Sequence, residues 1–198
     1  MAAVTSDQEL WGRAGAGDGD AFGELFDRHC DAIYNYLFRR TGDWSVAEDL
    51  TSVVFLEAWR RRRDLRLESA SALPWLFGVA TNVVRNERRS RRRHRVALAR
   101  LPKERAELDI AERVIDRVES EQTMREALAL LVRLPKEQQD VFALCGWSEL
   151  SYEAAALALG IPVGTVRSRL SRARARLAEL VVANGLEASR GATDARVA

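Results

Sequence analysis

Apolar residues recur at helical spacing through most of this chain, and the alternating pattern of a β-strand is almost absent. The four prolines, at positions 74, 102, 135 and 162, each lie in or beside a break between helical segments. A chain of 198 residues can form one medium domain or two small ones. The pattern therefore predicts an all-α protein.

The first half of the sequence predicts three helices. The glycine-rich stretch 15–20 makes a flexible entry, and Asp20 is a candidate N-cap for a helix over residues 21–40. Two further helices are expected at about 45–63 and about 72–93. These helices would form the first of two domains.

Residues 96–120 are charged, lack aromatic side chains and contain few apolar residues, so we interpret them as a flexible linker that can become partly helical when docked. A new apolar pattern starts near residue 121 and predicts four helices up to about residue 182. The predicted organisation is two small helical domains joined by this linker. The expected boundaries are an N-terminal segment 1–17, a first domain 18–95, the linker 96–120, a second domain 121–184 and a disordered tail 185–198.

Charge is distributed unevenly along the chain, although its net value is only +2. Residues 1–59 carry a net charge of −7 and residues 60–100 carry +10, whereas residues 101–164 carry −5 and residues 165–198 carry +4. Two basic blocks in acidic surroundings indicate two separate sites for a polyanion. Of the 31 basic residues, 29 are arginine. Arginine suits contacts with phosphates and base edges, but a GC-rich genome would produce the same bias.

Several protein classes can be set aside. No apolar stretch is long enough to cross a bilayer, and the N-terminal residues lack the pattern of a secretory signal, so we expect a cytoplasmic protein without membrane insertion. Cys30 and Cys145 are too few for a disulfide framework or a zinc site. His29 and His94 belong to no ligand or triad set, and the stretch 15–20 lacks the lysine of a phosphate loop. We predict no enzyme, no catalytic residue, no metal and no cofactor.

Residues 150–177 have the pattern of a helix–turn–helix. Ser151 can cap a first helix rich in small residues, Gly160 can end it in the left-handed conformation, and Pro162 suits the first turn of the next helix. Apolar residues form one stripe on the second helix: Val166, Leu170, Ala173 and Leu177. The opposite side would present arginine and serine to a major groove, the alternative being a solvated basic face. The candidate duplex-binding residues are Thr165, Arg167, Ser168, Ser171, Arg172 and, as a phosphate contact, Arg174.

Residues 72–95 combine an apolar stripe with an arginine-rich end. Arginines for the phosphate backbone, aromatic side chains and an amide are the ingredients of single-strand capture. Asn82 lies among apolar neighbours in the sequence and needs a hydrogen-bonding partner, which a base edge could supply. Trp75 could instead be an ordinary core residue. The candidate strand-binding residues are Trp75, Asn82, Arg85, Arg88 and Arg89.

The helix around residues 48–61 has more apolar residues than one buried side can hold. Leu50, Val54 and Ala58 can face the bundle, which leaves a second face of mixed apolar and acidic character. Such a face is typical of a protein–protein contact, unless a longer bundle covers it. The residues of this second face are Asp49, Ser52, Val53, Leu56 and Trp59.

Together these segments resemble the extracytoplasmic-function (ECF) sigma factors of bacterial RNA polymerase. Residues 18–42, 47–61 and 75–93 resemble region two of that family, and residues 134–177 resemble region four. The resemblance implies that region two docks on the polymerase clamp helices and captures the minus-ten promoter element as a melted strand with a flipped base. Region four would bind the minus-thirty-five element as duplex DNA.

By motif position, the resemblance assigns the second face of residues 48–61 to core RNA polymerase, Asn82 to the melted strand, and the second helix of 150–177 to the major groove. The loop at about 65–71 would shape the base pocket. The family commonly has Gln then Glu where this chain has Ser52 and Val53. Core polymerase, promoter DNA and an anti-sigma factor are the implied partners. The alternative function is an autonomous helix–turn–helix regulator, which would leave 72–95 without a role.

Overall fold

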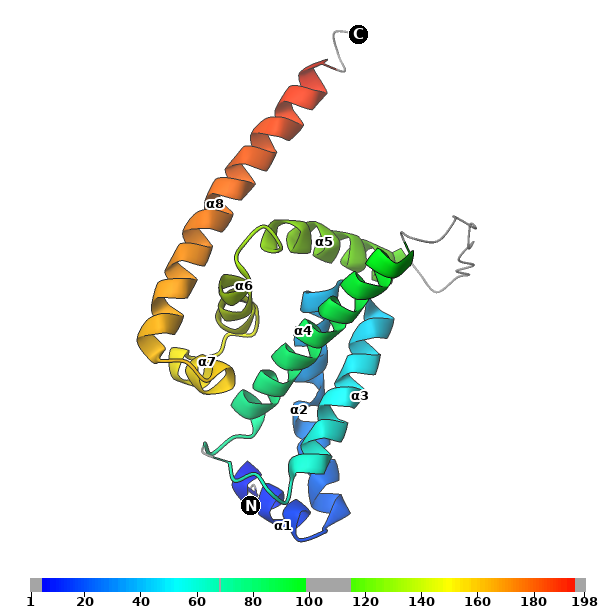
Figure 1. Ribbon diagram of the computed structural model, residues 1–198, viewed down its shortest axis with the longest axis vertical. Coiled ribbons are helices and arrows are strands. Elements are labelled where there is room, and N and C mark those ends of the chain that lie inside the picture. Colours follow the sequence, from blue (N-terminus) through cyan, green and yellow to red (C-terminus); the bar gives the residue numbers. More distant parts are fainter. Residues whose placement is uncertain (1–4, 68, 99–114, 195–198) are drawn as a thin grey trace.

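The computed structural model describes residues 5–67, 69–98 and 115–194, and the regular secondary structure in these ranges is helical (Figure 1). The prediction of an all-α protein is confirmed. The elements are α1 (Asp7–Gly15), α2 (Gly19–Thr41), α3 (Trp44–Arg61), α4 (Leu73–Leu98), α5 (Ile115–Leu131), α6 (Lys136–Phe142), a π-helical turn η1 (Ala143–Trp147), α7 (Tyr152–Leu159) and α8 (Val163–Asp194). Among the described residues no helix is long and apolar enough to span a membrane.

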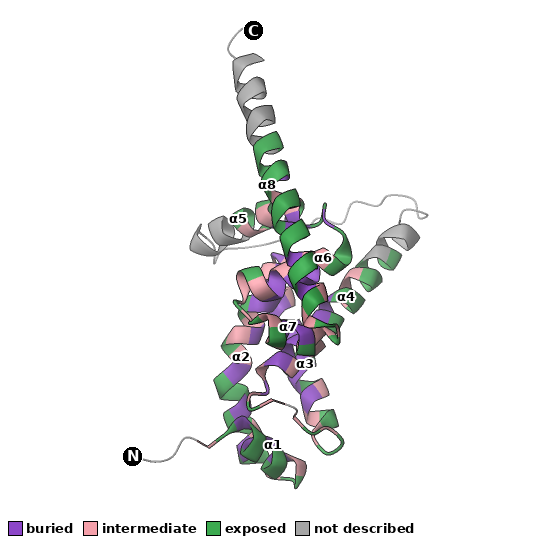
Figure 2. Ribbon diagram, turned by 90° about the vertical axis from the view of Figure 1, so that its left-hand side faces the viewer, coloured by how far each residue is buried: buried purple, intermediate pink, exposed green. Residues whose placement is uncertain are grey.

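The first half of the chain forms a bundle in which α2, α3 and α4 lie along one another. The apolar stripes that predicted these helices face inward, and Ile33, Val54 and Leu76 belong to one buried core. Figure 2 shows the buried residues on the inner sides of the helices. Burial of each such side chain contributes about 1.5–3 kcal/mol relative to exposure.

The start of α2 differs from the prediction, because Asp18 rather than Asp20 is its N-cap. The backbone of Asp18 is extended, and its carboxylate accepts a hydrogen bond from the backbone N–H of Ala21 at 3.0 Å. Asp20 lies in the first turn, where its negative charge favours the positive end of the helix. The helix ends at Gly42, whose φ of 65° suits a residue without a side chain.

Residues 7–15 form a helix that the sequence analysis did not predict. Ser6 and Glu9 make a capping box at its start, since each side chain bonds to the other residue's backbone N–H. Leu10, Trp11 and Ala14 are buried. The segment before the predicted first domain therefore contributes to the core of the bundle.

The second half of the chain contains the predicted helix–turn–helix. Ser151 caps α7 by accepting a hydrogen bond from the backbone N–H of Ala154 at 3.0 Å, and Gly160 ends the helix with a φ of 63°. On α8 the apolar stripe faces inward: Val166, Leu170 and Ala173 are buried. The predicted geometry of this segment is confirmed.

Helices extend further than predicted at three places. α4 runs to Leu98 and α5 starts at Ile115, so helix enters both ends of the expected linker, and residues 99–114 lie outside the described residues. α8 continues to Asp194, although a disordered tail was expected from residue 185. Alanine, leucine, glutamate and arginine in that stretch are good helix formers, and each of its two glycines costs only about 1 kcal/mol relative to alanine. Residues 195–198 lie outside the described residues.

The two halves of the chain are packed against each other, an arrangement that the expected flexible tether did not predict. One apolar cluster includes Leu76 and Phe77 of the first half together with Leu144 and Val166 of the second. α4 lies against α7 at Gly78, where an added Cβ atom would come within 2.5 Å of the carbonyl oxygen of Ala158. Only glycine permits this close approach of the two helices.

Candidate nucleic-acid interface

The outer face of α8 carries the candidate duplex-binding residues. Ser168, Ser171 and Arg172 are exposed, as are Arg167 and Arg174, whereas Thr165 is half-buried. Arg172 folds back along the helix, with its Nε donating to the carbonyl oxygen of Ser168 at 3.1 Å. The Arg167 guanidinium lies 5.6 Å from the centre of the Tyr152 ring. These contacts are local and leave the donors at the surface.

The first turns of α4 present the two candidate strand-binding residues that are not arginine. Trp75 is half-buried and meets the ring of Trp11 edge-on, with 5.2 Å between ring centres. Asn82 is exposed, although the sequence suggested an amide among apolar neighbours. Its Oδ1 lies 3.4 Å from Nη1 of Arg85. The side chain borders a cavity of about 430 Å³ between α3, α4 and α7, with Leu157 on the far side.

Arg85 and Arg88, two of the candidate strand-binding residues, are bound to α6. Arg85 donates from Nε and Nη2 to Oδ2 of Asp140, at 2.9 Å and 2.6 Å. Arg88 donates to Oε1 of Gln139 at 2.9 Å and to the carbonyl oxygen of Arg40 at 2.8 Å. Arg89 remains exposed. Part of the predicted single-strand surface is therefore occupied by the second half of the chain.

The outer face of α3 combines apolar and polar exposed residues, as the helical pattern predicted. The side chains of Val53 and Leu56 are 46% and 48% exposed, and Asp49 and Ser52 are exposed beside them. The inward residues Leu50, Val54 and Ala58 are buried. The side chain of Trp59 is less exposed to solvent than those of Val53 and Leu56.

Trp59 is half-buried between an aromatic ring and a guanidinium group. It meets Phe22 edge-on at 5.1 Å between ring centres, and the guanidinium of Arg62 lies 3.4 Å from its ring centre. This side chain therefore helps to hold the end of α3 as well as bordering the exposed face.

Comparison with known proteins gives the family. Residues 25–94 match the model of Sigma-70 region 2, and residues 124–177 match that of Sigma-70, region 4. The ECF RNA polymerase sigma factor SigM of Mycobacterium tuberculosis is 33% identical over 177 residues, which cover 89% of this chain and 85% of that protein. This chain belongs to the ECF sigma factors. The organisation into two helical domains, region two and region four, is confirmed.

Two other similar proteins extend this comparison. The ECF sigma factor BldN of Streptomyces coelicolor is 33% identical over 174 residues, and this chain spans only 65% of its length. A solved structure of CnrH, in complex with the cytosolic domain of CnrY, has a TM-score of 0.68 and 25% identity and covers 89% of this chain and 97% of that one. The superposition includes both regions of this sigma factor.

A buried ion pair joins region two to region four. Nη2 of Arg40 on α2 lies 2.7 Å from Oδ1 of Asp140 on α6, and both side chains are at least 97% buried. Burial disfavours the charge on Arg40, but neighbouring Tyr36 and Asp140 outweigh it and raise the pKa of the guanidinium. Asp140 thus holds Arg40 with one oxygen and Arg85 with the other.

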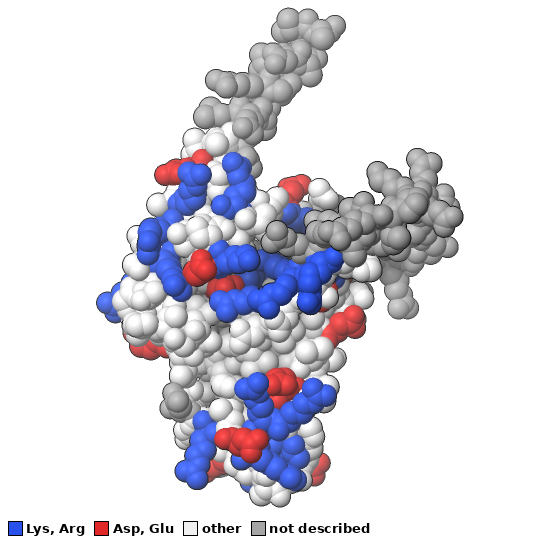
Figure 3. Space-filling model, in the orientation of Figure 1, with Lys and Arg blue, Asp and Glu red and all other residues white. Residues whose placement is uncertain are grey.

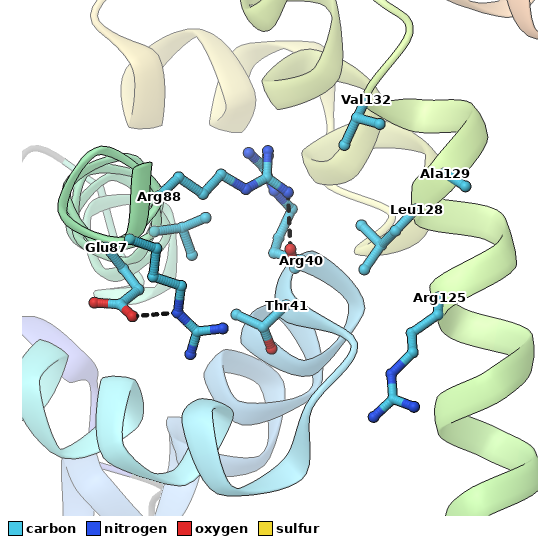
Figure 4. Close-up of a pocket in the computed structure, with 10 residues that line it drawn as sticks. Arg40, Thr41, Glu87, Arg88, Arg125, Leu128, Ala129 and Val132 are labelled. Atoms are coloured by element: carbon cyan, nitrogen blue, oxygen red, sulfur yellow. Dashed lines mark hydrogen bonds and ion pairs between the residues drawn. The ribbon is translucent and has the colours of Figure 1, made fainter. Parts of the chain in front are cut away.

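Positive charge is in excess along this junction. Arg88 is held by neutral oxygens rather than by a carboxylate, and burial together with the charge of Arg40 lowers its pKa. Figure 4 shows Arg88 and Arg40 beside a cavity of about 320 Å³ that Arg125 and Leu128 close from the α5 side. In Figure 3 a band of Lys and Arg crosses the molecule over α4 and α6.

The loop between α3 and α4 is held by residues that sequence analysis missed. The indole Nε1 of Trp11 donates to the carbonyl oxygen of Leu65 at 3.0 Å. Oδ2 of Asp7 accepts from the backbone N–H of Ala72 at 2.8 Å and from Oγ of Ser71 at 3.1 Å. The capping-box pattern at residues 6–9 was the available signal for this helix. No local signal marks Arg40 or Asp140, because they pair across 100 residues.

Proposed function

We propose that this ECF sigma factor binds core RNA polymerase and directs transcription initiation at specific promoters. Region four would bind the minus-thirty-five element as duplex, and region two would capture the melted strand of the minus-ten element. The observation that carries this proposal is the presence of three separate surfaces in one chain. They are the exposed face of α3, the Asn82 side of α4 and the outer face of α8.

Polymerase docking uses the outer face of α3. Val53 and Leu56 offer apolar area to a partner helix, and Asp49 supplies a carboxylate beside them. Apolar anchors with charged neighbours are what a helix-to-helix protein contact requires. Because Ser52 and Val53 replace the Gln and Glu common in the family, docking on this chain relies more on apolar contact.

Duplex recognition uses α8, whose buried stripe fixes the helix on the domain while Arg172 and Ser168 face outward. An arginine that forks to guanine discriminates against a wrong base by about 1–3 kcal/mol. Arg174, further along the helix, would contact phosphate and orient the domain without reading sequence.

Strand capture uses the Asn82 side of α4 after the two regions separate. The two promoter elements lie about 25 base pairs apart, which is about 85 Å along B-DNA. In the structure, α4 packs on α7, and α7 is joined to α8 through the turn at Gly160. Packed helices lie only about 8–10 Å apart, so this closed arrangement cannot bind both elements at once.

Separation also releases the arginines that the strand needs. Arg85 and Arg88 leave Asp140 and Gln139 and become available to phosphates. Flipping a base costs a few kcal/mol, which contacts from Asn82 and these arginines offset. The polymerase supports both regions at the required distance and raises the effective concentration of each at its element.

The proposal includes an anti-sigma factor as a partner and a cytoplasmic site of action, where the polymerase and the promoter are found. CnrH, whose solved structure resembles this chain over both regions, was solved in complex with the cytosolic domain of CnrY. A partner of this kind would stabilise the closed arrangement in which Asp140 holds Arg85.

A gel shift with duplex promoter DNA, with and without core polymerase, tests the function. We expect specific, tight binding only when core polymerase is present. Tight and specific binding by the free protein, unaffected by core polymerase, would instead favour an autonomous helix–turn–helix regulator. A variant with Leu56→Glu should lose the polymerase-dependent shift. The matched change Val181→Glu, at an exposed position on α8 beyond the candidate duplex-binding residues, should retain it.

A further inference from the structure

The loop between α3 and α4 is lined along one side by α1. Figure 1 shows α1 at the lower end of the bundle, beside the chain that links these two helices. We include in the proposed function the role that the family resemblance gives to this loop, which is to shape the pocket for the flipped base of the minus-ten strand. Its backbone is therefore part of the surface that would recognise the base. Contacts that fix the position of this backbone would affect which base is accepted.

Asp7 holds the end of the loop where α4 begins. Its Oδ2 accepts from the N–H of Ala72 and the hydroxyl of Ser71, while its Oδ1 accepts from Arg28 at 2.6 Å. His29 Nε2 lies 2.6 Å from the same carboxylate. Asp7 is only 5% exposed, so these bonds are shielded from water. They fix the direction in which the chain enters α4.

Trp11 holds the first part of the loop. It donates from Nε1 to the carbonyl oxygen of Leu65, and its ring meets Trp75, a candidate strand-binding residue, edge-on. The indole is 4% exposed. One side chain thus links the loop backbone to the aromatic ring on α4.

The C-terminal end of α1 contacts the start of the loop. Nε of Arg62 donates to the carbonyl oxygen of Ala14 at 3.2 Å. A Cβ atom on Gly15 would lie 2.9 Å from the carbonyl oxygen of Arg62, so glycine allows this approach. α1 therefore contacts the loop at residues 62 and 65 and again at residues 71–72, while Arg66 and Ala70 stay exposed.

We propose that α1 is a positioning element for base capture, in which Asp7 and Trp11 hold the described parts of the loop, residues 62–67 and 69–72, in the position that accepts the flipped base. This inference rests on the proposed function. Ordering a loop costs conformational entropy, and a loop that is already ordered does not incur that cost when the base arrives. A fixed pocket also discriminates between bases better than one that adapts to each of them.

The test is Trp11→Phe, which keeps an aromatic ring but removes the hydrogen bond to Leu65. The matched control is Trp44→Phe, the same change in region two at the opposite end of α3, where Trp44 stacks on Phe38. Both holoenzymes are assayed for open-complex formation on four promoters that differ only at the flipped position. The starting promoter is one that the wild-type holoenzyme transcribes.

We expect Trp11→Phe to lower discrimination between the preferred base and the others by about 2- to 12-fold, the range for one lost hydrogen bond. Binding to core polymerase and to the duplex upstream element should match the wild type. Trp44→Phe should keep the wild-type discrimination.

Unchanged discrimination in Trp11→Phe, or an equal loss in Trp44→Phe, would overturn the inference. If Trp11→Phe does not fold, as judged by its helical circular dichroism, Asp7→Asn is assayed in the same way and decides by the same criteria. Failure of the proposed function is distinguishable, because the wild-type protein would then support no transcription with core polymerase.

Discussion

Replacing Asp140 by asparagine is expected to separate region two from region four in the free protein. The two residues have nearly the same shape, but asparagine carries no charge and offers one acceptor oxygen instead of two. Arg40 and Arg85 can therefore no longer both be satisfied at this position. Arg40 would remain buried without a countercharge as long as the regions stay together.

The size of the effect follows from the burial of each pair. Removing one partner of a buried ion pair costs about 3–5 kcal/mol, whereas a partly exposed pair such as that of Arg85, whose side chain is 46% exposed, adds about 1 kcal/mol at most. When the regions separate, water solvates Arg40. Most of the cost of leaving Arg40 without its carboxylate therefore destabilises the closed arrangement and not the open one. The equilibrium between closed and open forms should shift toward open by roughly 150- to 4,000-fold.

Small-angle X-ray scattering and binding of a single-stranded minus-ten oligonucleotide measure this shift. We expect a larger radius of gyration and tighter binding of the strand by free Asp140→Asn. Glu137→Gln is the matched control, because it makes the same charge change at an exposed position on the same helix. An Asp140→Asn protein that scatters like the wild type and binds the strand no better than Glu137→Gln would refute this reasoning.

Three further outcomes are expected. Asn82→Ala should slow promoter opening and leave polymerase binding intact, as measured by permanganate footprinting beside a pull-down; equal losses in both would make Asn82 a structural residue. Arg172→Ala should weaken binding of the upstream duplex by about 1–3 kcal/mol, whereas Arg176→Ala, which loses an exposed pair with Glu179, should lower affinity without changing the preferred sequence. Asp7 is buried, which tends to raise its pKa, but the hydrogen bond from the backbone N–H of Ala72 and the charge of His29 hold the pKa below its ordinary value. Its contribution to stability is therefore complete above about pH 4 and is lost as the pH falls through the lowered pKa, so thermal unfolding of Asp7→Asn should depend less steeply on pH in that range than the wild type. Parallel pH profiles for the two proteins would contradict this assignment.

Features with a local cause were predictable from the sequence. Ser151 and Gly160 mark the two ends of α7, because a cap and a left-handed glycine act on adjacent residues. The buried apolar stripe on α8 follows from helical geometry. The exposed face of α3 was predicted from the same helical geometry, after Leu50, Val54 and Ala58 had been assigned to the buried side. The functional roles given to these surfaces stay predictions.

Features that depend on distant pairs were not predictable from local patterns. Nothing in the residues around Asp140 indicates that it pairs with Arg40, and Gly78 looks like an ordinary helical glycine until α7 is placed against it. The flexible tether was predicted from the composition of residues 96–120. That composition describes the linker itself and gives no information on whether the surfaces of the two domains pack together. α1 was missed although Ser6 and Glu9 carried a capping-box signal, because its apolar residues are few and lie outside the repeated pattern.

Run-off transcription with purified core polymerase on a library of genomic promoter fragments tests the assigned function most directly. We expect transcripts from a subset of fragments that share two sequence elements about 25 base pairs apart, and only when this protein is added. Transcription that is the same with and without the protein, despite a folded preparation, would contradict its assignment as an initiation factor.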